Sequence, residues 1–399
     1  MSPVLPFDVI AVIVEIVREN KDIDLLKELA LVSHSFYQAC IKHLFANINL
    51  RDAVLNYRLV SSKKEFVELL KSRPHLVKSI RKLTYEAGRK YDDHLLAPTL
   101  SNFLPTISCL NCLAINGSYL NWNALDSSLR SAFLHLMSLP TINHIDLSNI
   151  KNFPLSSLTS SVNLLRLDMT DMACLDYPEE DIIPKTLMLP KIRELHTSNS
   201  YQLTKKLFDV KGQDGRPVFN FMDLRQLSMS LTLLNKEPNI RRLLQNAKLF
   251  ERLHLSVDIG QSLVGVLSTN SRTLKVLDLT AVPVYQYHGV PPLAGLCEEL
   301  EVMEGHNTLE ALRVSFDVLV DSNHREDWVG STIQEVENVL VKPGWSALRQ
   351  VSFKLPIRDQ GRGSAELTEA LQYLPDKYLS RLSKLESVAF NYSAYLVYN

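Results

Sequence analysis

Several side chains that could do chemistry recur at one position of a repeated pattern in this sequence, each between two residues that are apolar except for Thr197. In chain order they are Asp146, Asp168, His196, Ser228, His254 and Asp278. A carboxylate, an imidazole and a hydroxyl can form a catalytic triad, for which the sequence offers Asp168, His196 and Ser228. Two carboxylates and two imidazoles can also ligate zinc, for which the sequence offers Asp168, His196, His254 and Asp278.

Neither kind of chemistry is complete with these residues alone. A triad also needs an oxyanion hole inside a shielded cleft, and this row has no adjacent glycine turn that would supply one. Zinc ligands must converge in a tetrahedron rather than stand in a row. We therefore interpret the row as a polar surface that binds another protein. A hydrolase is the alternative, and labelling by a serine-reactive fluorophosphonate that disappears in Ser228→Ala would establish it.

Other sites for metals, nucleotides or nucleic acid are not indicated. Cys109 and Cys112 form a C-x-x-C pair without a second pair, and the sequence contains neither G-x-x-x-x-G-K-[ST] nor G-x-G-x-x-G. The 43 basic residues nearly balance 44 acidic ones, and a net charge of −1 does not attract nucleic acid or an anionic membrane. We expect no cofactor, no bound metal, no nucleic-acid partner and no membrane association.

The five cysteines are an odd number scattered along the chain, which is not typical of a disulfide framework. Because such thiols are stable in a reducing compartment, we expect a cytoplasmic or nuclear protein.

The row of polar residues belongs to a repeated leucine motif, and leucine makes up more than one residue in six. The motif places three apolar residues in an L-x-x-L-x-L pattern, with Thr197 as its one polar member. Its copies are Ile80/Leu83/Tyr85, Leu110/Leu113/Ile115, Ile142/Ile145/Leu147, Leu164/Leu167/Met169, Ile192/Leu195/Thr197, Leu224/Leu227/Met229, Phe250/Leu253/Leu255, Leu274/Leu277/Leu279, Leu309/Leu312/Val314, Leu348/Val351/Phe353 and Leu385/Val388/Phe390.

This pattern predicts an α/β fold, an irregular leucine-rich-repeat solenoid of about eleven repeats. Each copy becomes a short strand whose flanking apolar residues face the core while the single residue between them faces out. Helical spacing between the strands predicts helices over residues 123–139, 240–249, 328–341 and 366–382. On the concave face we predict a protein-binding surface formed by His144, Asp146, Arg166, Asp168, His196, Arg252, His254 and Asp278.

The first 46 residues are different, because their apolar residues follow helical spacing. Val9, Ile13, Ile16 and Val17 predict the buried stripe of a first helix. Asp22 or Asp24 can cap a second helix, and Ser33 or Ser35 a third. Phe45 to Leu50 alternates as a strand would and should form the edge that starts the repeats. We predict a helical domain over 1–46 and the repeats over 47–399.

The amino-acid sequence of this helical segment resembles an F-box, as found in the large F-box families of mushroom-type fungi. The resemblance lies in Leu5-Pro6-x-Asp8-Val9, in Asp24-Leu25, and in Leu29-Ala30-Leu31-Val32-Ser33-His34-Ser35-Phe36. Phe36 stands where the family usually has tryptophan, and Ser35 stands where it has a basic residue. The resemblance covers about 45 residues, and a leucine-rich tail is the common companion of this domain.

The resemblance implies a non-catalytic substrate receptor of a Skp–cullin–F-box type ubiquitin ligase. The helices would bind the Skp-type adaptor, which connects to a cullin-RING ligase, and the repeats would hold a protein substrate. The positions that match the family's motif are Leu5, Pro6, Val9, Ile13, Leu29, Val32 and Phe36. The alternative is a leucine-rich-repeat scaffold that acts without a ubiquitin ligase.

Overall fold

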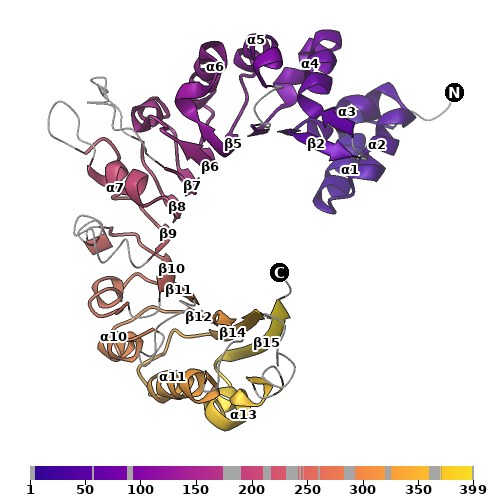
Figure 1. Cartoon of the computed structure of the whole chain (residues 1–399). Coiled ribbons are helices and arrows are strands. Elements are labelled where there is room, and N and C mark those ends of the chain that lie inside the picture. The colour runs from indigo at the N-terminus through magenta and orange to yellow at the C-terminus, as the bar shows by residue number, and fades with distance from the viewer. Residues whose placement is uncertain are drawn as a thin grey trace. The chain divides into compact units, whose positions relative to one another are not determined.

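A computed structural model of the chain describes residues 5–55, 58–87, 93–173, 190–209, 217–230, 241, 244–245, 247–258, 261–282, 293–319, 325–358, 369 and 371–397. The chain forms two compact units (Figure 1). The first unit comprises Met1–Pro190 and Ser200–Phe219, and the second comprises Lys191–Asn199 and Asn220–Asn399.

Three helices open the first unit, as the sequence predicts: α1 (Phe7–Glu19), α2 (Ile23–Val32) and α3 (His34–Leu44). Asp22 caps α2 by accepting a hydrogen bond from the Leu25 amide at 3.0 Å, and Ser33 caps α3 by accepting one from the Phe36 amide at 3.3 Å. The predicted boundary after residue 46 falls between α3 and the first strand, and as a domain boundary it stays a prediction.

The predicted buried stripe of α1 is largely wrong. The three helices pack around Ile10, Val14, Val17, Leu26 and Cys40, whereas Val9 and Ile16 are exposed and Ile13 is half-buried. Both stripes have helical spacing because α1 is apolar on two sides. Periodicity therefore identifies the helix but does not say which apolar side faces the core.

Parallel strands in chain order form the main sheet of the first unit. They are β1 (Asn47–Leu50), β4 (Lys82–Glu86), β5 (Cys112–Asn121), β6 (His144–Lys151) and β7 (Arg166–Thr170). Helices cover one face of this sheet and leave the other open (Figure 1). The other elements among the described residues of this unit are β2 (Asp52–Leu55), β3 (Arg58–Ser61), α4 (Ser62–Ser72), η1 (Pro74–Ser79), α5 (Asp93–Phe103), η2 (Leu104–Thr106), η3 (Trp122–Ala124), α6 (Ser127–Met137), η4 (Leu155–Ser160) and α7 (Tyr201–Asp209).

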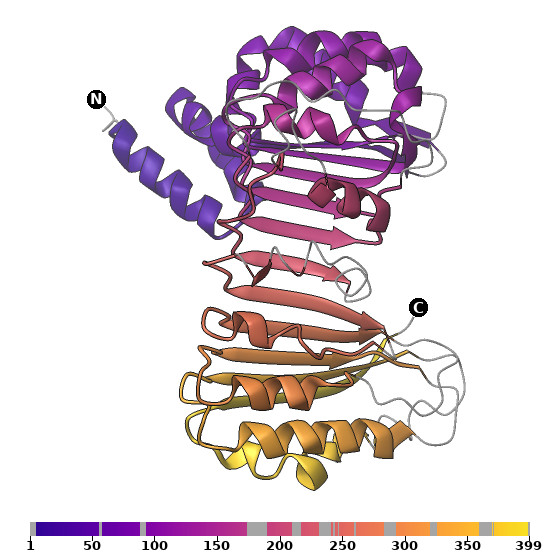
Figure 2. The same ribbon diagram turned by 90° about the vertical axis from the view of Figure 1, so that its left-hand side faces the viewer.

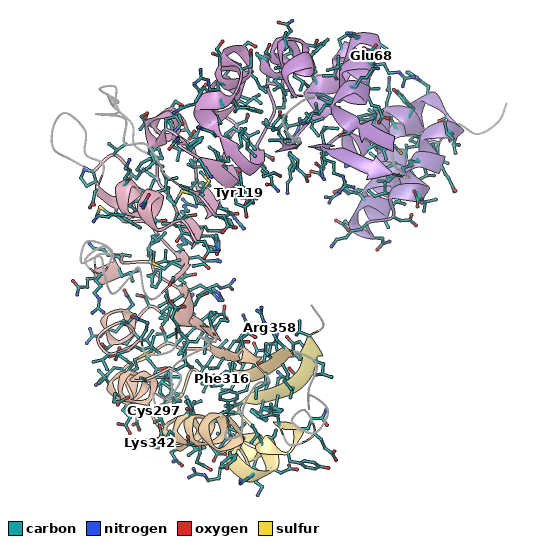
Figure 3. The ribbon with its side chains drawn as sticks, viewed as in Figure 1. Glu68, Tyr119, Cys297, Phe316, Lys342 and Arg358 are labelled. Atoms are coloured by element: carbon teal, nitrogen blue, oxygen red, sulfur yellow. The ribbon has the colours of Figure 1, made fainter. Side chains whose placement is uncertain are left out.

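The second unit repeats this plan (Figure 2). Its sheet contains β8 (Glu194–Ser198), β9 (Gln226–Ser230), β10 (Arg252–Asp258), β11 (Val276–Val282), β12 (Ala311–Phe316), β14 (Gln350–Arg358) and β15 (Ala389–Val397), all parallel, with the short β13 (Val318–Leu319) also paired to β14. The other described elements are η5 (Ser268–Asn270), α10 (Leu296–Met303), α11 (Arg325–Leu340), α13 (Leu374–Tyr378) and η6 (Leu382–Lys384). Cys297 on α10 and Lys342 after α11 lie on the helix-bearing side (Figure 3).

A recurring pair of backbone hydrogen bonds aligns the starts of successive strands. The carbonyl before one strand accepts two amides that lead into the next strand. In the first unit the Ala46 carbonyl accepts from the amides of Arg81 and Lys82, both at 2.8 Å. In the second unit the Arg225 carbonyl accepts from Glu251 and Arg252, both at 2.9 Å. The repeats therefore start at one common edge of each sheet.

The predicted leucine motif is confirmed in ten of its eleven copies, where all three motif residues are buried. The last copy has the wrong register. Val351 pairs with Phe390 rather than with Val388, so the strand is shifted by two residues and Leu385, Val388 and Phe390 are only half-buried. A shift of two residues keeps each side chain on its face, so alternation alone could not fix the register here.

Two of the predicted helices match α6 and α11 closely. Within 366–382 the described residues Glu369, Leu371 and Gln372 are helical, and α13 and the start of η6 follow them. Within 240–249 the described residues Arg241, Leu244 and Gln245 are helical, residues 247–249 are not, and the other four lie outside the described residues. Where the chain is described, no helix has both the length and the apolar character needed to cross a membrane.

Candidate binding surfaces

Two surfaces stand out, and the first covers α1 and α2. Nine of the eighteen large apolar side chains that are exposed among the described residues fall within residues 5–32. Leu31 is 88% exposed and Val32 66%. We call this set the apolar helix surface: Leu5, Phe7, Val9, Val12, Ile16, Ile23, Leu25, Leu31 and Val32. Such a concentration is typical of a surface that another protein covers.

The structure sorts the residues that resemble the F-box motif into two groups. Leu5, Pro6, Val9 and Val32 are exposed. Ile13 is half-buried, and Leu29 and Phe36 pack against the core of the three helices. Sequence reasoning missed six members of the apolar helix surface as exposed residues: Phe7, Val12, Ile16, Ile23, Leu25 and Leu31. The sequence feature that could have identified them is the apolar content of this segment, which is too large for three short helices to bury.

A hollow of about 330 Å³ lies between α1 and α3 beside Val12. Its polar edge is formed by Glu15, Lys42 and His43. Glu15 pairs with Arg18 at 2.5 Å and lies 3.6 Å from the ring of His43. Burial lowers the pKa of His43, with Glu15 opposing that change. The apolar helix surface therefore has a charged border on one side.

The second surface is the open strip, which we define as the outward-facing side chains of the parallel strands on the sheet face opposite the helices. The eight residues predicted to bind a protein substrate all belong to it. Arg252 is exposed and the other seven are half-buried: His144, Asp146, Arg166, Asp168, His196, His254 and Asp278. Strand alternation places them as predicted, because their neighbours along each strand are core residues.

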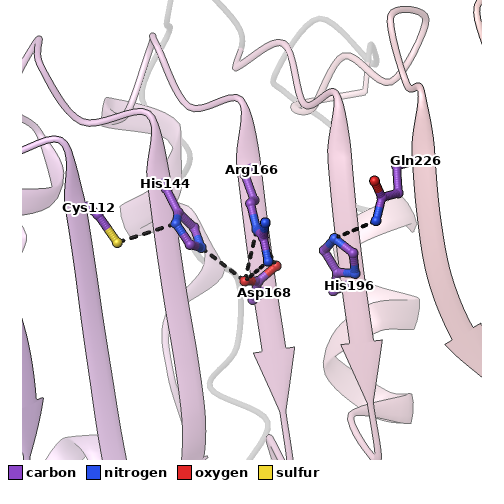
Figure 4. Close-up of polar contacts among 6 residues, drawn as sticks. All are labelled: Cys112, His144, Arg166, Asp168, His196 and Gln226. Atoms are coloured by element: carbon purple, nitrogen blue, oxygen red, sulfur yellow. Dashed lines mark hydrogen bonds and ion pairs between the residues drawn. The ribbon is translucent and has the colours of Figure 1, made fainter. Parts of the chain in front are cut away.

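In the first unit, four side chains of the open strip form a chain of polar contacts (Figure 4). His144 contacts the Cys112 sulfur through Nδ1 at 3.3 Å and the Asp168 carboxylate through Nε2 at 2.9 Å. Arg166 donates from Nε to both oxygens of Asp168, at 3.2 and 3.1 Å. The hydrogen bond to Asp168, followed by the one to Cys112, raises the pKa of His144 to about 9. His144 is therefore an imidazolium at neutral pH.

Asp146 stands next to this chain, with Asp168 as its register partner on β7. Burial raises the pKa of Asp146, and the charge of Asp168 raises it further. His144, Lys82 and Arg166 partly offset these effects. The first unit thus presents charges of both signs on its part of the open strip.

The open strip of the second unit has its own contacts. The His196 ring lies 3.3 Å from the Gln226 amide nitrogen. Arg313 approaches Asp278 at 3.4 Å and donates to the Gln350 carbonyl oxygen at 3.3 Å. Beyond the strip, Arg358 pairs with Asp317 at 2.5 Å where β14 ends (Figure 3). Each of these contacts joins polar or oppositely charged side chains of neighbouring repeats.

The residues considered for catalysis and for zinc are divided between the two units. Asp168 is engaged by His144 and Arg166 in the first unit, whereas His196 and Ser228 belong to the second. Among the described residues, no group of three or more His, Cys, Asp or Glu side chains could hold a metal ion. Sequence reasoning missed the Cys112–His144–Asp168 chain, although Cys112, His144 and Arg166 occupy one position of successive repeats.

Comparisons with known proteins add little to this geometry. No protein-family model matches the chain, and no curated protein matches it. A solved structure of a TLR13–ssRNA13 complex is similar to it with a TM-score of 0.33 and 13% sequence identity. The similarity covers 90% of this chain but 37% of the TLR13 chain, so this chain spans little more than a third of that protein. The repeat fold accordingly rests on the strand register and the buried motif residues of the chain itself.

Proposed function

We propose that this protein is the substrate-recognition subunit of a Skp–cullin–F-box type ubiquitin ligase. In this proposal the apolar helix surface binds the Skp-type adaptor, which connects the protein to a cullin-RING ligase. The open strip holds a protein substrate. The protein itself is not catalytic and needs no cofactor.

The observation that carries the proposal is the apolar helix surface. Residues 5–32 are less than a tenth of the chain, yet they hold half of the exposed large apolar side chains that the structure describes. Leaving a large apolar side chain in water forfeits about 1.5–3 kcal/mol of burial free energy, so a partner that covers several of them gains affinity. The same segment resembles the F-box, and that resemblance points to a Skp-type adaptor as the partner.

The open strip supports the second half of the proposal. Most of its side chains are polar, with both charge signs, and many are half-buried, as in His144, Asp168 and Arg313. Interfaces of this kind gain specificity from matched charges rather than from apolar area. Parallel strands also hold the side chains of the open strip rigidly, so little conformational freedom would be lost on binding.

Titration of the full chain with a purified Skp-type adaptor tests the proposal. The variant Val9→Ser with Val32→Ser changes two exposed residues that the core does not use. Because interface anchors commonly contribute 2 kcal/mol or more, we expect the Kd to rise about thirtyfold or more. The matched control is Val264→Ser with Val302→Ser, two equally exposed valines of the second unit, which should leave the Kd unchanged.

The alternative function is a leucine-rich-repeat scaffold that does not bind the adaptor. It would be favoured if the wild-type chain showed no adaptor binding at micromolar concentrations. Equal loss of affinity in both double variants would mean that the adaptor does not use the apolar helix surface. Reversal of charge in Arg252→Glu, on the open strip, should not change adaptor affinity, because that residue belongs to the second unit.

A further inference from the structure

The open strip of the first unit contains a thiol in an environment that protein binding does not explain. Cys112 opens β5, and its neighbour Leu113 faces the core, so alternation turns Cys112 to the open face. Its Sγ lies 3.3 Å from Nδ1 of His144. Cys112 is buried, with 8% of its surface exposed.

The charges around Cys112 are mostly positive. In the register of the sheet, Lys82 on β4 and His144 on β6 flank Cys112, and Arg166 follows on β7. The two nearby carboxylates, Asp146 and Asp168, lie one row further along the strands. Asp168 binds the far ring nitrogen of His144 at 2.9 Å and so orients the ring toward the sulfur.

This arrangement has the parts that activate a cysteine. An imidazole ring within hydrogen-bond distance of a sulfur atom is the usual partner of a nucleophilic cysteine. A carboxylate on the other ring nitrogen stabilises the imidazolium and fixes its orientation. The geometry therefore matches a Cys–His–Asp chain in which Asp168 is a positioning residue.

We propose that Cys112 is a nucleophilic thiol and a site of reversible S-thiolation by low-molecular-weight disulfides. The Cys112 thiolate attacks one sulfur of the disulfide, and a new S–S bond forms between them. The original S–S bond breaks, and its electron pair leaves with the second sulfur as a thiolate, which takes a proton from water. The reaction needs no oxyanion hole and no cofactor, only the disulfide itself.

Other cysteines of the chain provide internal comparators. Burial raises the pKa of Cys40, and it raises the pKa of Cys297 to about 12. Cys109 is half-buried three residues from Cys112, and its sulfur lies 3.8 Å from the Ser108 hydroxyl. The labelling rate of Cys109 therefore measures whether a substitution has loosened the same segment.

The test treats the folded full-length chain with iodoacetamide, and separately with glutathione disulfide, and follows each cysteine by peptide mass spectrometry. We expect Cys112 to react with iodoacetamide at least about tenfold faster than Cys297, and to form the mixed disulfide. A reductant should then restore the free thiol. Labelling of Cys112 no faster than of Cys297 would overturn the proposal. Alkylation without any mixed disulfide would overturn the S-thiolation.

Two variants separate activation from packing. His144→Gln keeps a polar side chain without the cation, and Asp168→Asn removes the charge that orients His144. Both should slow labelling of Cys112 by about tenfold or more while Cys109 stays unchanged. A merely structural role predicts the opposite, because loosening the strand would speed labelling of both cysteines. Unchanged Cys112 labelling in both variants would also contradict the proposal.

Discussion

At the scale of single residues, His144 is the most informative side chain of the open strip. Its two ring nitrogens contact Cys112 and Asp168, and it lies on the central strand of the three that carry this chain of contacts. Sequence analysis placed His144 and Asp168 on the same face of the strands but did not predict that they touch. Sequence spacing gives the row of each residue, whereas side-chain length and direction decide which neighbours touch.

We expect the imidazole of His144 to titrate near pH 9 in the folded protein, as its hydrogen bond to Asp168 requires. NMR titration of the ring protons would measure it, and Asp168→Asn should lower the value. A pKa near the ordinary 6.5 in the wild type would contradict the contacts described for His144.

The raised pKa of His144 also makes the unfolding free energy depend on pH. A pKa that is raised on folding gives stability that is fully present below the unfolded pKa, near 6.5, and that is lost as the pH rises through about 9. The wild type should therefore exceed His144→Gln in unfolding free energy near pH 6, and the difference should shrink toward pH 9.5. Urea denaturation at several pH values measures it. A difference that stays constant over this range would show that His144 is not held protonated.

At the scale of elements, the strands were predictable and the face of α1 was not. Ten copies of the leucine motif became strands because three apolar residues at fixed spacing can be buried together in only one way. Helix α1 is apolar on two sides, so which side faces α3 depends on tertiary packing that periodicity does not contain. The register of β15 failed for a related reason, since Val388, Phe390 and Tyr392 alternate equally well.

Burial of the motif residues gives a direct stability prediction for one repeat. Leu253 is 1% exposed, so Leu253→Ala should lower the unfolding free energy by about 2–5 kcal/mol. Leu249, four residues earlier and 44% exposed, is the matched control, and Leu249→Ala should cost no more than about 0.5 kcal/mol. Chemical denaturation measures both. Similar losses in the two variants would mean that the strand is not packed as described.

At the scale of the whole molecule, we propose two different partners for two chemically different surfaces. The apolar helix surface lies on the first three helices, where large apolar side chains outnumber the core positions available to them. The open strip runs along the strands of each unit and carries charges of both signs, while the whole chain has a net charge of −1. A substrate receptor needs this separation, because adaptor and substrate must be bound at the same time.

Hydrogen–deuterium exchange of the full chain, with and without a saturating Skp-type adaptor, tests this division most directly. Covering the apolar helix surface should slow exchange in peptides from residues 5–36, where α1, α2 and the start of α3 lie. Peptides from β4 to β15 should exchange at the same rate in both samples. Unchanged exchange over residues 5–36, or protection confined to the strands, would contradict the proposed role of the N-terminal helices.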